Sequence, residues 1–367
     1  MCFVALNILA RWCRNITVQM PPDLVSKLPG WVGGFCRGTS GTRFKPSQDF
    51  EKNPIGPAFA SCLGVAEVFR QAVGLSGNQE ASSWYSLFDF SWSKDAPDKL
   101  ANPTLDSRIE LGRIQQVGCG AVASSLDQLI ALTEWTAAID LIDYDRTDPT
   151  NCNRSLAFYA SDCVSDAYKA DVCDRVLKTG DFHPRVYRAS YAQFVEAGHY
   201  LEQTPDIILC LANEQNVWST IQNNLPPLVF HATTTRNWGT NFGRHIPKMD
   251  WCLMCRFEQE LNYQFVPNCG EGQLVSESFG TPAVEGVLPF LSPAASVILL
   301  SELAKVSLPG YPFNSNFVTF SLRRPEGQFL QLQKPPRENC LCKDQPIDIY
   351  PPQIKSTKYW DLTVRQL

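Results

Sequence analysis

A glycine-rich turn is the first feature of this chain that could do chemistry. Gly118, Gly120 and Ala123 have the spacing G-x-G-x-x-A. The first glycine permits a tight turn, the second lets backbone N–H groups approach a phosphate, and the alanine lets a helix pack closely on the preceding strand. An anion would lie at the helix N-terminus, where free N–H groups and the helix dipole favour it. The pattern predicts a phosphate-binding turn; small residues there that serve packing alone are the alternative.

Acidic and basic residues follow this turn at informative distances. Asp143 ends the next predicted strand, where a carboxylate can accept hydrogen bonds from ribose hydroxyls. Asp145 comes two residues later, and Asn151 and Arg154 close the stretch as N-x-N-R. A nicotinamide or flavin oxidoreductase needs nothing particular after the acidic residue. The tail therefore argues against a redox cofactor and for another nucleotide.

In order and spacing, these residues resemble the signature D-x-D-x-(V/I)-x-x-(S/T)-N-L-N-R of the ubiquitin-activating enzyme family. That family includes the adenylyltransferases that activate sulfur-carrier proteins for molybdopterin and thiamine synthesis. The resemblance covers residues 105–345. It implies ATP-dependent adenylation of the C-terminus of a ubiquitin-like protein, which is then handed to a conjugating-enzyme-like partner. The layout around residues 57–74 is similar to bacterial relatives in conjugation and antiphage operons, which implies such a role here.

The resemblance also implies roles for single residues. Gly118 and Gly120 would line the phosphates of ATP, and Asp143 would hold the ribose. Asn151 and Arg154 would contact the phosphates, with Arg154 in a catalytic role because it offsets charge on the leaving pyrophosphate.

Two further positions match the family, one in the predicted helix 162–178 and one directly after the predicted strand 206–212. Lys169 corresponds to an ATP-contacting lysine, with an ordinary solvated helix lysine as the alternative. Asn213 corresponds to the asparagine of a C-x-D-N pattern. The family takes one more arginine from a second subunit, which implies a homodimer; Arg70 and Arg113 are the candidates for it.

One departure from the family pattern bears on turnover. Ala212 stands where the family usually has an aspartate that helps to hold Mg²⁺ near the α-phosphate. Glu214 is close enough to replace it. The alternative is a degenerate, non-catalytic member that binds a ubiquitin-like or conjugating protein. Beyond this stretch, Thr233, Thr234 and Thr235 follow a predicted strand and could either contact substrate backbone or form a turn.

Four cysteines in two close pairs predict a structural zinc site. Cys252 and Cys255 form a C-x-x-C, and Cys340 and Cys342 form a C-x-C. Four thiolates suit tetrahedral Zn²⁺, and the resemblance implies a zinc whose pairs flank a helix, here residues 294–305. Free cysteines are the alternative.

Cys269 lies in a V-P-N-C segment that resembles the crossover loop of the family. The resemblance implies that its thiolate attacks the acyl-adenylate and takes over the acyl group, a step that needs an exposed cysteine. An ordinary loop cysteine is the alternative reading.

Composition limits the remaining possibilities. The chain has 367 residues, 44% hydrophobic and 19% charged, with a net charge of −5. These values predict a packed globular protein, and the lack of a long Lys/Arg run argues against nucleic acid as a partner. The apolar run 287–303 contains Pro289 and Pro293, which predicts a core helix and no membrane span. Fourteen cysteines without a secretory signal predict reduced thiols in the cytoplasm.

Strands that alternate with helices predict an α/β, Rossmann-like fold with a mostly parallel sheet and helices on both faces. The cysteine pairs and the family resemblance imply a zinc-ribbon-like C-terminal elaboration. Residues 31–57 and 77–103 are expected to be mostly loop. The domain expectation is an N-terminal accessory region at 1–104, an adenylation domain with crossover loop at 105–345, and a tail at 346–367. The expected strands are residues 113–117, 138–143, 184–189, 206–212 and 228–231, and the expected helices are 57–74, 121–132, 162–178, 216–223 and 294–305.

Overall fold

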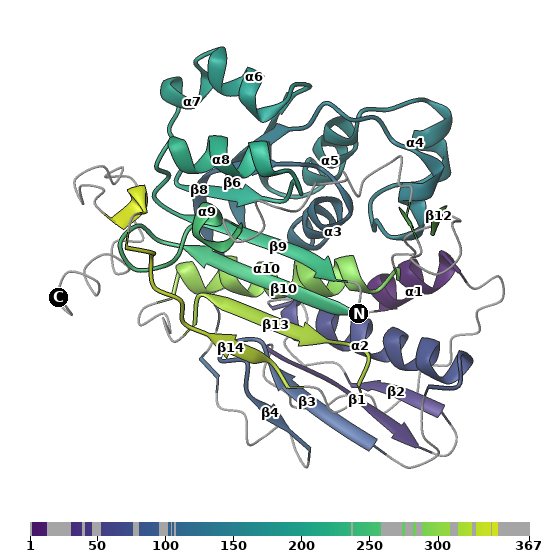
Figure 1. The fold of residues 1–367 in the computed structure, drawn as a ribbon. Coiled ribbons are helices and arrows are strands. Elements are labelled where there is room, and N and C mark those ends of the chain that lie inside the picture. Colours follow the sequence, from purple (N-terminus) through teal and green to yellow (C-terminus); the bar gives the residue numbers. More distant parts are fainter. Residues whose placement is uncertain are drawn as a thin grey trace.

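An eight-stranded sheet forms the centre of the molecule (Figure 1). The computed structural model describes residues 2–12, 31–38, 41–45, 53–75, 81–94, 102–103, 105, 108–235, 238–257, 274–275, 282–283, 288–308, 315–324, 328–338 and 340–343. The sheet order is β14-β13-β10-β9-β8-β5-β6-β7, and the five strands from β9 to β7 run parallel. The strands are β5 (Glu110–Val117), β6 (Thr136–Ile142), β7 (Phe182–Tyr187), β8 (Ile207–Cys210), β9 (Val229–Thr235), β10 (Gly239–His245), β13 (Phe317–Ser321) and β14 (Leu330–Leu332).

Strand β8 shows why the sheet carries helices on both faces. Its four residues are all buried, and successive side chains point to opposite faces. Ile207 and Leu209 join the larger core, with α2, α3, α5 and α10. Ile208 and Cys210 join the second core, built from α6, α8 and α9. The prediction of a mostly parallel, Rossmann-like sheet with helices on both faces is confirmed. These helices are α2 (Ile55–Ala72), α3 (Ala121–Ile130), α5 (Lys169–Leu177), α6 (Tyr191–Glu196), α7 (His199–Glu202), α8 (Gln215–Asn223), α9 (Leu253–Phe257) and α10 (Leu291–Val306).

A second, antiparallel sheet corrects the expectation that residues 31–57 and 77–103 are mostly loop. Its order is β2-β1-β3-β4, and α2 packs between it and α10 (Figure 1). A Cβ on Gly33 would lie 2.4 Å from the carbonyl oxygen of Gly56, so glycine allows strand and helix to touch. The glycines that resemble loop punctuation therefore mark close backbone packing. The strands are β1 (Val32–Gly38), β2 (Gly41–Lys45), β3 (Ala81–Ser86) and β4 (Trp92–Ser93).

The helix expected over residues 162–178 is divided in two. Helix α4 (Ala160–Val164) ends before Asp166, whose φ of 52° lies in the left-handed region that terminates helices. Helix α5 then begins at Lys169. Since the Lys169 N–H donates to the Asp145 carbonyl at 2.9 Å, this break fixes the start of α5 beside the end of β6.

The remaining elements are short and lie around this framework. Helix α1 (Cys2–Ala10) packs on α2, and the Trp12 and Phe69 rings meet edge to face at 5.5 Å. Within the described part of the chain, no helix combines the length and apolar character required to cross a bilayer. The short elements are the 3₁₀ helices η2 (Pro149–Asn153) and η4 (Leu341–Lys343), and the strands β11 (Leu274–Val275) and β12 (Pro282–Ala283).

Candidate functional site

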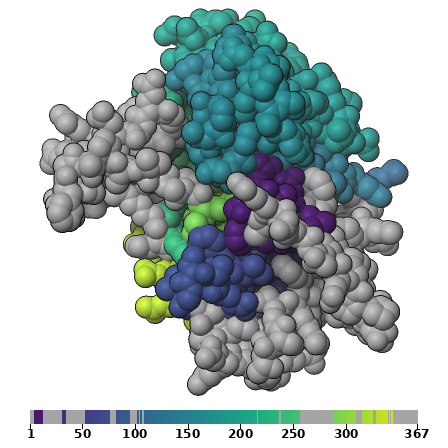
Figure 2. Space-filling model, turned by 90° about the vertical axis from the view of Figure 1, so that its right-hand side faces the viewer, coloured from purple at the N-terminus to yellow at the C-terminus, as the bar shows by residue number. Residues whose placement is uncertain are grey.

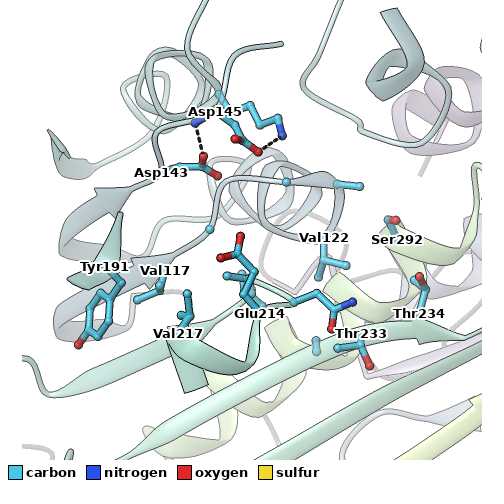
Figure 3. A pocket seen from close by; sticks show the side chains of 18 of the residues that line it. Val117, Val122, Asp143, Asp145, Tyr191, Glu214, Val217, Thr233, Thr234 and Ser292 are labelled. Atoms are coloured by element: carbon cyan, nitrogen blue, oxygen red, sulfur yellow. Dashed lines mark hydrogen bonds and ion pairs between the residues drawn. The ribbon is translucent and has the colours of Figure 1, made fainter. Parts of the chain in front are cut away.

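A cavity of about 660 Å³ opens at the carboxyl ends of β5, β6, β8 and β9 (Figure 3). Strands β6 and β8 lie on opposite sides of β5, so the strand order reverses here. Ligands of open α/β sheets bind at such a reversal. Of the residues predicted to bind nucleotide, the cavity is lined by Gly118, Gly120, Asp143, Arg154, Lys169 and Asn213.

The two glycines of the turn meet different constraints. Gly118 has a φ of 94°, and a Cβ there would lie 2.7 Å from the Ala212 backbone nitrogen. Its role is thus to let β5 turn sharply against the end of β8. Gly120 caps α3 with a φ of −76°, and a Cβ there would meet no atom within 4 Å. The open space above Gly120 is where a phosphate could approach the backbone.

Alanine substitutions should separate these two roles. We expect Gly118→Ala to lower the free energy of unfolding by about 2 kcal/mol or more, because it adds backbone strain and a clash. Gly120→Ala should leave stability within about 0.5 kcal/mol of wild type but weaken ATP binding. Chemical denaturation and calorimetric titration with ATP measure the two effects. Equal destabilisation by both substitutions would contradict this assignment.

Asp143 holds the turn as well as facing the cavity. Its Oδ2 accepts the Cys119 N–H at 2.6 Å. Its Oδ1 accepts the Asp145 N–H at 2.8 Å, a bond drawn in Figure 3. Burial raises the pKa of Asp143, and these two N–H groups oppose that rise. The carboxylate therefore joins the ends of β5 and β6 into one rigid rim.

Lys169 lies at the same rim. Its Nζ is 2.7 Å from Asp145 Oδ2. The residue is 9% exposed, which excludes an ordinary solvated lysine. A cation therefore lies at the cavity rim at the start of α5, paired with a carboxylate.

Asn151 and Arg154, though close in sequence, have different positions. The Asn151 side chain is buried, and its Oδ1 accepts the Asp148 N–H at 3.1 Å within the cap of η2. It is not among the cavity-lining residues. Arg154 lines the cavity, and its guanidinium donates to the Thr150 carbonyl at 2.6 Å. In this arrangement Asn151 shapes the segment that presents Arg154.

Ala212 lines the cavity between the end of β8 and the start of α8. Its side chain has no ligand atom, and its carbonyl accepts the Trp218 Nε1–H at 3.0 Å. Glu214 directs its carboxylate into the cavity, on the side where Asp143 and Asp145 lie (Figure 3). The Glu214 charge is the main cause of a raised pKa at Tyr144.

The other half of the cavity is polar but uncharged. Thr234 of β9 and Ser292 at the start of α10 lie on the same side of the sheet, and the Thr233 side chain points to the opposite side (Figure 3). Trp238 and Asn241 complete this wall. The sequence pointed to the threonines alone, because Asn241 and Ser292 come from elements distant in sequence. Hydroxyl and amide groups here can bind the backbone of an extended chain without a charge of their own.

A buried carboxyl lies directly beneath the turn. Asp127 of α3 is 1% exposed, and its Oδ2 accepts a hydrogen bond from Gln116 Nε2 at 3.0 Å. Burial raises the pKa of Asp127 to about 7 from an ordinary 3.8, although hydrogen bonds from Cys173 and Gln116 oppose the rise.

This raised pKa predicts a pH-dependent stability. Below pH 3.8, Asp127 is protonated in both the folded and unfolded chain. As pH rises towards 7, the unfolded chain releases a proton that the folded protein retains, so stability falls by up to about 4 kcal/mol. Urea denaturation between pH 4 and 8 should show this slope in wild type and a shallower one in Asp127→Asn, because burial also raises the pKa of Asp143. The same slope in both proteins would contradict the prediction.

The four predicted metal cysteines meet, although 88 residues separate Cys252 from Cys340. Their sulfur atoms all lie within 4.8 Å of one another. All four thiols are free, and Cys252 Sγ is 3.4 Å from Cys340 Sγ. Neighbouring thiols lower the pKa of Cys255 by hydrogen bonding, while contacts with Cys255 and burial raise that of Cys252 to about 12. Such a cluster sustains several thiolates only with a cation at its centre.

The other predicted residues are accounted for as follows. Arg70 is buried and pairs with Glu67, and Arg113 pairs with Asp140 at 2.9 Å. Neither arginine lines this cavity. Cys269 and the tail 346–367 lie outside the described residues.

Comparison with solved structures finds matches of low identity. E. coli MccB in complex with MccA matches with a TM-score of 0.45 and 15% identity, over 86% of this chain and 98% of that one. E. coli MccB with ATP matches with a TM-score of 0.44 and 14% identity, over 86% of this chain and 98% of that one. PaaA matches with a TM-score of 0.41 and 14% identity, over 61% of this chain and 64% of that one. No curated protein matches the chain.

A family comparison covers well over half of the chain. The ThiF family model matches residues 99–342, which include the glycine turn, the Asp143–Arg154 stretch and all four clustered cysteines. This match confirms the predicted resemblance to the adenylyltransferases related to ubiquitin-activating enzymes. The chain therefore belongs to the ThiF family.

Proposed function

We propose that this protein binds MgATP and adenylates the terminal carboxyl group of a peptide or carrier protein. The observation that carries the proposal is the two-part cavity. One half holds the Gly118 turn, Asp143 and Lys169, and the other offers the hydroxyls of Thr234 and Ser292. A nucleotide and an extended chain terminus could thus meet in one cavity, where proximity lowers the barrier.

The residues suggest how the reaction would proceed. A substrate carboxylate attacks the α-phosphorus of ATP, the bond from that phosphorus to the bridging oxygen breaks, and pyrophosphate leaves. Asp143 would hold the ribose while backbone N–H groups near Gly118 and Gly120 bind phosphate oxygens. Arg154 and Lys169, both on the cavity lining, would stabilise the charge that develops on pyrophosphate. Asn213 lines the same rim, and Asn151 would act by holding the Arg154 segment.

Glu214 fits the requirement for a magnesium ligand. Mg²⁺ binds through one or two carboxylates together with substrate phosphates, and it would neutralise phosphate charge. Ala212 offers no side-chain oxygen, but Glu214 and Asp145 both line the cavity. Their carboxylates therefore supply the donor type that the cation needs.

Removal of the Glu214 charge should weaken the use of Mg²⁺. We expect Glu214→Gln to raise the Mg²⁺ concentration for half-maximal ATP binding about tenfold, as a lost ionic ligand. Glu196→Gln is the matched control, because Glu196 is exposed on α6 and does not line the cavity. Fluorescence titration with an ATP analogue gives the values. Identical Mg²⁺ dependence in Glu214→Gln and wild type would exclude Glu214 as a ligand.

The finer identity of the substrate rests on the sequence resemblance. It supports a ubiquitin-like carrier, transfer through Cys269 or directly to a conjugating-enzyme-like partner, a homodimer, and a cytoplasmic bacterial conjugation or antiphage system. ATP–pyrophosphate exchange, measured with ubiquitin-like proteins encoded beside this gene, tests the proposal. Exchange that requires a carrier with its terminal glycine is the expected result.

Two failures of this experiment would have different meanings. If ATP binds and carriers bind but no exchange occurs, the protein is a non-catalytic binding member, a reading that Ala212 favours. If calorimetry detects no ATP binding, the adenylation proposal is wrong.

The cysteine cluster completes the proposal with a structural Zn²⁺. Cys252, Cys255, Cys340 and Cys342 provide four sulfur donors and no open position, which suits a structural site. The ion would join the segment after β10 to the segment after β14.

A further inference from the structure

The N-terminal helix touches the segment that presents Arg154. Figure 2 shows α1 lying between α2 and the part of the molecule that contains residues 110–180. Helix α1 lies outside the span 99–342 that matches the ThiF family. We infer that Arg11, at the end of α1, is a positioning residue that holds the Arg154 segment in place for the adenylation reaction. This inference rests on the proposed function.

Arg11 binds this segment at three points. Its guanidinium donates to the carbonyl of Cys152, to that of Leu156 at 2.9 Å and to that of Phe158 at 3.2 Å. Asn7 supports the same contact, since its Nδ2 donates to the Leu156 carbonyl at 3.1 Å. Arg11, the residue directly after α1, therefore binds carbonyls on both sides of Arg154.

The form of the Arg11 side chain suits this task. Asn7 Oδ1 accepts from Arg11 Nε at 2.9 Å and from Nη2 at 2.7 Å, which orients the guanidinium from behind. Its acceptors are neutral carbonyl and amide oxygens, so no carboxylate neutralises the cation in these contacts. A planar group with five N–H donors can bridge several carbonyls at once, whereas a lysine ammonium is a single point with three donors. The arrangement favours arginine specifically.

The consequence for the site follows from chain geometry. Arg154 lies between Cys152 and Leu156, and its own guanidinium donates to Thr150 and Asn153 within the same turn. Those contacts fix the Arg154 side chain relative to η2, while Arg11 fixes the following backbone relative to α1. A small displacement of a charge that stabilises a leaving group reduces rate more than binding. Arg11 should therefore act on kcat more than on KM.

The first experiment measures the segment itself. Amide hydrogen exchange of residues 153–158 in nucleotide-free protein should be about tenfold faster in Arg11→Met and Arg11→Lys than in wild type. Trp12→Ala is the matched control, because it removes the packing of α1 on Phe69 and leaves the Arg11 contacts. We expect Trp12→Ala to lower the melting temperature with less change in exchange at 153–158. Unchanged exchange in both Arg11 variants would overturn the inference.

The second experiment measures the reaction. In ATP–pyrophosphate exchange, both Arg11 variants should lose about tenfold in kcat with KM for ATP within about twofold of wild type. If Trp12→Ala has the same melting temperature as the Arg11 variants and loses as much kcat, Arg11 contributes only to folding and the inference is overturned. If wild-type protein shows no exchange with any carrier, the proposed function fails, while the hydrogen-exchange result still decides whether Arg11 holds the segment.

Discussion

Asp143→Ala should reduce ATP–pyrophosphate exchange at least about 10²-fold. The carboxylate accepts two backbone N–H groups, from Cys119 and Asp145, and so shapes the turn that would bind phosphate. A hydrogen bond to a charged group contributes about 1.5–3 kcal/mol, and loss of two such bonds plus the ribose contact exceeds the energy equivalent of a 10²-fold change. ATP affinity, measured by calorimetry, should fall in parallel.

Asp143→Asn distinguishes two parts of this role. The amide can still accept one N–H bond, but it lacks the charge and the second equivalent oxygen. The exchange activity of Asp143→Asn should therefore lie between that of wild type and that of Asp143→Ala. Asp171→Asn is the control, because that carboxylate pairs with Arg188 outside the cavity. Its activity should match wild type. Full exchange activity in Asp143→Ala would show that the nucleotide binds elsewhere.

Removal of zinc should have the second large effect, on stability. We expect one Zn²⁺ per chain, and a melting temperature about 10 °C or more lower after chelation, because binding energy at four thiolates is also folding energy. Among the described residues, these four sulfur atoms are the cysteine cluster that could hold a metal ion, and they come from two segments far apart in the sequence. Elemental analysis and thermal unfolding before and after chelation test this expectation.

Single substitutions sharpen the zinc test. Cys255→Ser should lose the metal and reproduce the low melting temperature. Cys163→Ser is the control, since that thiol lies 3.4 Å from Cys152, away from the cluster, and its loss should leave zinc content unchanged. Purified protein without zinc and with an unaltered melting temperature after chelation would show that the cysteines are free thiols.

Much of the site framework could be predicted from the sequence because its signals are local. The G-x-G-x-x-A spacing and the apolar runs at β6 and β8 are read within a few residues, and they place Gly118 and Asp143 at the carboxyl ends of neighbouring strands. The ThiF family match confirms the resemblance that these spacings indicated.

Other features were misread where a local signal has two meanings. Gly33 resembles a loop residue, but it allows β1 to touch α2. The stretch 162–168 contains no proline or glycine that would signal a helix end, but the left-handed conformation of Asp166 breaks the helix and brings Lys169 to Asp145. In both cases the conformation depends on what packs against the chain.

By itself, then, the sequence determined the five parallel strands, the glycine turn, the acidic strand end and the two cysteine pairs, because each depends on backbone geometry within one strand, helix or turn. Only the tertiary structure decided which distant residues share a space. It brought Cys252 to Cys340, placed Ser292 beside Thr234, removed Asn151 from the cavity lining and brought Arg11 to the segment after Asn151. Contacts of this kind arise from the packing of whole helices and sheets, and residue spacing along the chain carries no direct record of them.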